Sequence, residues 1–79
     1  MKKSEAIKRI AKLEQVQGLL NDAIFLIRTA MEGTKMENTC ESYIIQHLDN
    51  WGEGINEHDD TTIPRLIEYL ENEMEADEE

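Results

Sequence analysis

The residues with the clearest chemical potential lie close together near position 58. Four consecutive groups that can bind a divalent cation stand there: Glu57, His58, Asp59 and Asp60. Because adjacent side chains point in different directions, we interpret this run as a solvated acidic loop. The segment 49–60 also has the length of a calcium-binding loop, but Trp51 takes its third position, where such a loop places an oxygen ligand. We therefore predict no metal and no cofactor.

Catalysis would need a nucleophile beside a base, and neither candidate has such a partner. Cys40 lies in the first turn of an expected helix, where a thiol can be activated, but we interpret it as a small core residue. His47 lies four residues from both Tyr43 and Trp51, and no nucleophile or acid is spaced to join it. A small-molecule site beside these three side chains is an alternative. The favoured prediction is a protein without enzymatic activity.

Length and charge restrict the remaining classes. A chain of 79 residues forms one small domain of marginal stability, and its single cysteine excludes an internal disulfide. Its net charge of −10 argues against unaided binding to nucleic acid or to an anionic membrane. Neither a signal-peptide pattern nor a long apolar run is present, so we expect a cytoplasmic protein.

The element around which the chain is organised is an amphipathic helix from Ser4 to Glu32, with Ser4 as its N-cap and Gly33 after its end. Its apolar seam alternates steps of four and three residues through Ala6, Ile10, Leu13, Gln17, Leu20, Ile24, Ile27 and Met31. The polar Gln17 either fixes the register between two copies or faces solvent. Gly18 either allows a backbone to approach closely or has no role.

A second apolar stripe runs beside the seam, and residues 23–27 are apolar on every side of the helix. One covering helix would leave part of this surface in water, so we expect a second copy of the chain to cover it. The predicted oligomer interface, most simply that of a dimer, consists of Leu20, Ile24, Phe25, Leu26, Ile27 and Met31.

Two shorter helices follow. Asn38 and Glu41 have the spacing of a capping box, which predicts a helix that runs to about Trp51 and stops at Gly52. Apolar residues spread over more than half of its circumference, which again suggests two neighbours. After a polar loop over 52–60, threonines and Pro64 predict the start of a third helix. We expect one helical domain over residues 1–75 and a disordered acidic tail over 76–79.

Charge at the chain ends predicts how these helices pack. Residues 1–12 hold five bases and one acid, a net charge of +4, whereas residues 68–79 hold seven acids and no base. Each cluster opposes the dipole of its own helix, so the two ends would stabilise each other if they met. We therefore predict an all-α hairpin in which the two shorter helices return antiparallel to the first, completed into a bundle by oligomerisation. An up-down-up three-helix monomer is the competing topology.

The acidic surface suggests a function. Carboxylates on neighbouring helices can together imitate the phosphate spacing of a nucleic acid. We expect a small protein that binds a basic, nucleic-acid-handling protein and inhibits it, by analogy with inhibitors from phages and other mobile elements. The alternative is a self-assembling structural or regulatory subunit whose charge only keeps it soluble. The predicted partner-binding residues are Glu37, Glu41, Glu68, Glu71, Glu75, Tyr43 and Trp51.

Overall fold

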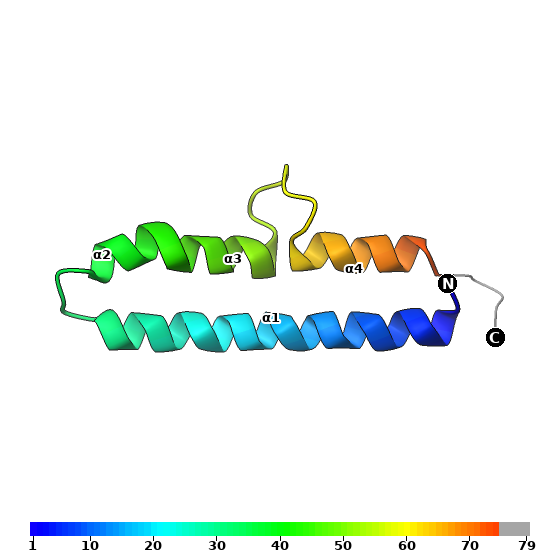
Figure 1. Cartoon of the computed structure of the whole chain (residues 1–79), viewed down its shortest axis with the longest axis horizontal. Helices are drawn as coiled ribbons and strands as arrows, with labels where there is room; N and C mark the ends of the chain where they lie inside the picture. Colours follow the sequence, from blue (N-terminus) through cyan, green and yellow to red (C-terminus); the bar gives the residue numbers. More distant parts are fainter. Residues whose placement is uncertain (75–79) are drawn as a thin grey trace.

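The computed structural model describes residues 1–74 as a helical hairpin with a broken second arm (Figure 1). Its elements in chain order are α1 (Lys3–Met31), α2 (Glu37–Cys40), the π-helical turn η1 (Glu41–Ile45), α3 (Gln46–Glu53) and α4 (Ile63–Asn72). The elements α2, η1 and α3 form one continuous rod, and α4 continues its line beyond a protruding loop. The predicted hairpin is confirmed, and the three-helix up-down-up topology is wrong.

The hairpin is a thin slab. Its Cα atoms extend over 55 × 23 × 9 Å, and their radius of gyration is 16.0 Å. A compact domain of this length would have a radius of gyration of about 12 Å. The slab is therefore only one helix thick, so only the strip between the two arms can form a core.

That strip is the predicted seam of α1. Its eight positions are buried or half-buried, and the other α1 residues are exposed, with the exception of Ala23. Opposite them, Ile45, Ile63 and Leu70 of the second arm are buried. The four-three spacing thus identified the core face of α1 correctly. It also means that the most apolar line of α1 is covered within the chain.

The ends of α1 agree only partly with the prediction. The helix begins at Lys3 with Lys2 in the N-cap position, and no side chain caps it, so Ser4 was wrongly assigned as the cap. At the other end, Gly33 adopts a φ of +78°, which is the left-handed conformation that glycine tolerates best. The predicted role of Gly33 as the helix stop is confirmed.

The second arm differs from the sequence prediction in its register. Asn38 lies inside the first turn of α2 instead of capping it, since Met36 holds the N-cap position. The turn η1 then adds one residue to the helical repeat, so that Cys40 and Ile45, five residues apart, both turn away from solvent. This π turn accounts for part of the wide apolar arc that suggested two neighbours.

Gly52 does not end α3. It is buried, and a Cβ atom built on it would lie 3.4 Å from Leu20 Cδ1, so it marks a close approach of the two arms. The helix ends at Gly54, whose φ is +71°. The chain then leaves the arm and returns at Thr62, the N-cap residue of α4, with Pro64 in the first turn as predicted.

Hydrogen bonds hold the loop between α3 and α4 in one shape. The Asn50 amide donates to Asp59 Oδ2 at 3.1 Å, and Asp59 Oδ1 accepts from both the backbone N–H and the hydroxyl of Thr61. These bonds lower the pKa of Asp59, chiefly through the Thr61 N–H. The Arg65 guanidinium donates to the carbonyl of Glu57 at 3.2 Å. Some polar groups of the predicted acidic loop therefore form hydrogen bonds that connect α3 to the start of α4.

Candidate functional site

The two broad faces of the slab differ in the side chains that they carry. An ion pair between the two arms identifies one of these faces. Arg28 of α1 donates two hydrogen bonds to Glu41 of η1, at 2.7 and 3.2 Å, across one side of the seam. The pairing lowers the pKa of Glu41 and raises that of Arg28, and Asp49 adds to the rise for Arg28. Arg28, Glu41 and Asp49 therefore share a face, which we call the acidic face.

Helical geometry assigns the other exposed side chains. At about 100° per residue, side chains of both arms fall on the side of the seam opposite Arg28. This apolar face carries Val16, Leu19, Ala23, Leu26 and Ala30 of α1 and Ile44, Leu48 and Trp51 of the second arm. Leu19 is 59% exposed and Leu26 is 63% exposed. An exposed apolar stripe that spans both arms indicates a binding surface.

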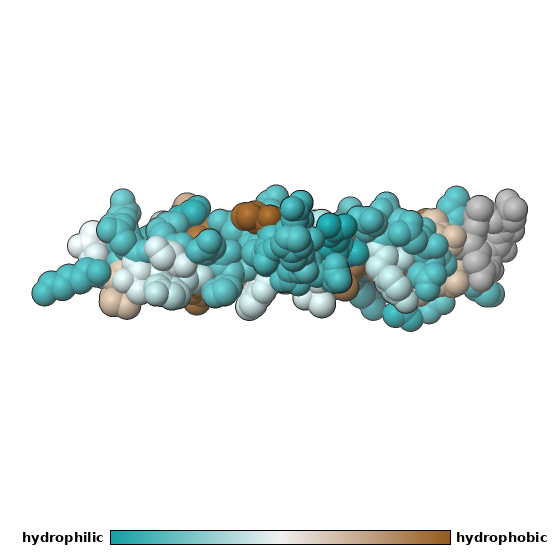
Figure 2. All heavy atoms as spheres, turned by 90° about the horizontal axis from the view of Figure 1, so that it is seen from above, coloured by the Kyte–Doolittle hydropathy of each residue, from teal (hydrophilic) through white to brown (hydrophobic). Residues whose placement is uncertain are grey.

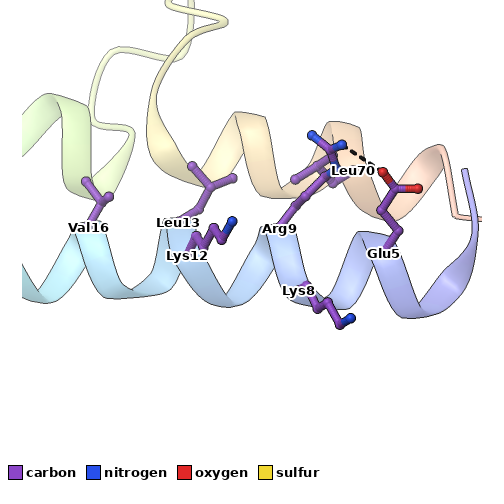
Figure 3. A pocket seen from close by; sticks show the side chains of 7 residues that line it. All are labelled: Glu5, Lys8, Arg9, Lys12, Leu13, Val16 and Leu70. Atoms are coloured by element: carbon purple, nitrogen blue, oxygen red, sulfur yellow. Dashed lines mark hydrogen bonds and ion pairs between the residues drawn. The ribbon is translucent and has the colours of Figure 1, made fainter.

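A basic groove continues the apolar face toward the N-terminus (Figure 3). It has a volume of about 500 Å³, and Leu13, Val16 and Leu70 give it an apolar part. Its charged lining consists of Glu5, Lys8, Arg9 and Lys12. Arg9 pairs with Glu5 at 2.7 Å, and this hydrogen bond lowers the pKa of Glu5. The groove thus places positive charge on the apolar face of a strongly acidic protein.

A second hollow lies on the α3 side of the same face. It has a volume of about 400 Å³ and is lined by Tyr43, Ile44, His47, Leu48 and Trp51. The rings of His47 and Trp51 are tilted by 31° with their centroids 6.3 Å apart. His47 is exposed, so it is not a core residue. The hollow is open and apolar, which suits a protruding aliphatic side chain.

The predicted partner-binding acids are not gathered on one track. Glu41 pairs with Arg28, and Glu37 accepts a hydrogen bond from the Gly33 N–H at 3.3 Å. Glu68 lies 3.7 Å from Arg65, and Glu75 lies outside the described residues. Tyr43 and Trp51 are exposed, but they line the apolar hollow.

Sequence reasoning missed part of the acidic face. By the same helical geometry, this face also carries Glu14, Glu32, Asp49 and Glu53, beside Glu71, which is one of the predicted partner-binding residues. The four-residue spacing of Asp49 and Glu53 predicts that they lie on one side of a helix. Which face of the hairpin that side belongs to depends on the register of α3 against α1, which the π turn sets. Phe25, 65% exposed, projects among these acids.

The six residues predicted for the oligomer interface separate into two groups. Leu20, Ile24, Ile27 and Met31 lie in the seam and pack within the chain. Phe25 and Leu26 are exposed, and they point about 100° apart on either side of the outer edge of α1, Phe25 toward the acidic face and Leu26 toward the apolar face. Exposed apolar surface around residues 19–30 is therefore real, although most of the predicted residues are not part of it.

Other kinds of site find little support in residues 1–74. This part of the chain contains no group of three or more histidine, cysteine, aspartate or glutamate residues placed to hold a metal ion. Its helices include none that is long and apolar enough to cross a membrane. The outer edge of the second arm and its loop is mostly hydrophilic (Figure 2). The two broad faces therefore remain the candidate sites. The chain matches no protein-family model, no curated protein and no solved structure.

Proposed function

We propose that this protein works without enzymatic activity, by binding another protein through its acidic face. The favoured partner is a basic protein that handles nucleic acid, and the favoured effect is inhibition by occupying its nucleic-acid-binding surface. The observation that carries this proposal is the clustering of charge: acids from both arms share one face, on which the base Arg28 is already paired with Glu41.

The acidic face also offers an anchor that a purely solubilising surface would not need. Phe25 is exposed on the same side of the seam, and aromatic side chains dominate the binding energy of protein interfaces. Carboxylates around it would steer a basic partner and fix its orientation. This combination favours a protein partner, whose surface can offer both a pocket and positive charge.

The test compares two variants that change the net charge equally. D49N/E53Q/E71Q neutralises three acids of the acidic face, and D22N/E57Q/D60N neutralises three exposed acids elsewhere. A basic protein retained by the wild-type chain from its host is purified, and its displacement from a fluorescent DNA duplex is measured over a range of salt concentrations. We expect the first variant to displace the DNA at least about tenfold less well and with a weaker salt dependence. Equal behaviour of the two variants would show that the charge acts only in solubility.

A second candidate function rests on the other face. The uncovered stripe on the apolar face favours a self-assembling structural or regulatory subunit, as the sequence also predicts. Self-association and partner binding are compatible, because they use opposite faces of the slab. We propose both, with the homodimer as the form that binds the partner.

A further inference from the structure

We infer that two copies of the chain associate face to face through the apolar face, about a twofold axis parallel to the long direction of the slab. The product is a four-helix bundle in which Leu19 and Leu26 of each copy enter the hollow on α3 of the other. This inference rests on the proposed self-association and does not depend on the acidic face. It replaces the seam residues of the predicted interface by a different surface.

The protruding side chains of Leu19 and Leu26 lie at the same level along the slab as the hollow on the α3 side. Two contacts between the arms fix that level, from Gln17 to Gly52 and from Arg28 to Glu41. Between these contacts α1 and the second arm run antiparallel (Figure 1). Leu19 therefore lies within one residue, about 1.5 Å, of the level of Trp51, and Leu26 lies equally close to the level of Ile44.

A twofold axis along the slab creates two equivalent contacts between leucines and hollows. It places α1 of each copy over the second arm of the other copy without a shift in level. Each leucine pair then faces the hollow of about 400 Å³ that Ile44, Leu48 and Trp51 line. All neighbouring helices in the resulting bundle are antiparallel, as in common four-helix bundles.

The area and the charge of this face fit a second copy. The two arms form a face up to 55 Å long and two helices wide, and with helices of about 10 Å diameter its area exceeds the roughly 800 Å² per partner that a stable interface buries. The acidic faces of both copies point outward, so their carboxylates are not buried at the interface. Lys8, Arg9 and Lys12 instead meet the end of α4 of the other copy, where Glu73 is exposed.

Two adjacent residues give the matched test. Leu26 and Phe25 are 63% and 65% exposed, but Leu26 points toward the apolar face and Phe25 toward the acidic face. We expect the wild-type chain to have twice the monomer mass by light scattering at micromolar concentration. Leu26→Glu should raise the dimer dissociation constant at least about tenfold, because it buries an unpaired carboxylate, whereas Phe25→Glu should leave the dimer intact. Leu19→Glu is a second disrupting variant, and circular dichroism checks that each variant is helical.

A monomeric wild type, a dimer that survives both leucine variants, or equal loss in Phe25→Glu would each overturn the inference. The first outcome would leave the apolar face for a foreign partner. The acidic-face proposal is separable, because Phe25→Glu and the acid-neutralising variant should weaken partner binding without changing the mass.

The direction of the axis has its own measurement. A spin label on Ser4→Cys, in a chain that also carries Cys40→Ala, reports the distance between the two N-termini. We expect no more than about 30 Å, because a bundle two helices wide measures roughly 20–24 Å across. An axis perpendicular to the long direction would send the N-termini to opposite ends, with a separation of the order of the 55 Å length of the slab, and would overturn the proposed arrangement.

Discussion

The side-chain amide of Gln17 donates a hydrogen bond of 2.9 Å to the backbone carbonyl of Gly52. Gln17 is the only polar residue of the α1 seam, and Gly52 lies in the last turn of α3, where carbonyl groups lack helical partners. The interpretation of Gln17 as a solvent-facing residue is therefore wrong, since it is half-buried and bonded within the chain. Its interpretation as a residue that fixes the register between two copies stays a prediction. Within the chain, Gln17 fixes the register between the arms just before the second arm breaks.

Replacing Gln17 by alanine should destabilise the hairpin. The substitution leaves the buried Gly52 carbonyl without its donor, and we expect a loss of about 1–2 kcal/mol in the free energy of unfolding. Urea unfolding at fixed protein concentration measures the change. Q15A is the matched control, because Gln15 is exposed on the same helix and loses no seam contact. Equal destabilisation by the two variants would mean that the hydrogen bond contributes nothing.

The parts of the fold that could be predicted from the sequence depend on periodicity and on residues with special backbone preferences. The four-three repeat identified the seam, Gly33 marked the end of α1, and Pro64 marked the start of α4. The π turn has no such local signature. Gly52 was misread because a glycine needed for close packing inside a helix looks in sequence like one that ends it.

Two glycines should respond in opposite directions to alanine. Gly18 is exposed in α1, and a Cβ atom on it would meet nothing within 4 Å, so G18A should stabilise by up to about 1 kcal/mol through helix propensity. Gly54 has a φ of +71°, and its Cβ atom would lie 3.3 Å from Thr62 Oγ1. G54A should therefore destabilise by about 1–2 kcal/mol. Thermal unfolding of both variants tests this, and a stabilised G54A would contradict the assigned loop geometry.

Asp59 should make part of the stability depend on pH. Its hydrogen bonds to Thr61 and Asn50 hold its folded-state pKa below the ordinary value of about 3.9. The stabilisation is therefore fully present above that value and is lost as the pH falls through the lower pKa of the folded state. We expect D59N to be less stable than wild type at pH 6, and the difference to shrink below about pH 4.

Urea unfolding of D59N and wild type between pH 2 and pH 7 measures that difference, on a scale set by the ordinary carboxyl pKa values of roughly 4. D60N is the control, because it removes the neighbouring charge and leaves the Asp59 hydrogen bonds to Thr61 in place. If D60N reproduced the pH dependence of D59N, the cause would be net charge and not the loop.

The candidate sites were less predictable than the fold for a geometric reason. A sequence pattern shows that Phe25 and Leu26 are both apolar, but which side of the seam each occupies matters only once the second arm is placed. The same holds for Glu41, whose pairing with Arg28 requires the register that the π turn creates. Faces of a hairpin are properties of two helices together, so single-helix patterns could not assign them.

The π turn should tolerate the loss of one residue, whereas the helix after it should not. Deleting the exposed Ser42 turns the five-residue step between Cys40 and Ile45 into the four-residue step of an α-helix, so both stay directed toward α1. We expect a folded hairpin with the free energy of unfolding changed by no more than about 1 kcal/mol.

Deleting the exposed Gln46 is the control. This deletion rotates the part of the second arm before residue 46 by about 100° relative to Leu48 and Gly52, which removes Ile45 from the seam. That deletion should cost at least about 2–3 kcal/mol, since Ile45 is buried, and circular dichroism with urea unfolding compares the two. Equal damage from both deletions would show that the π turn is required for more than register.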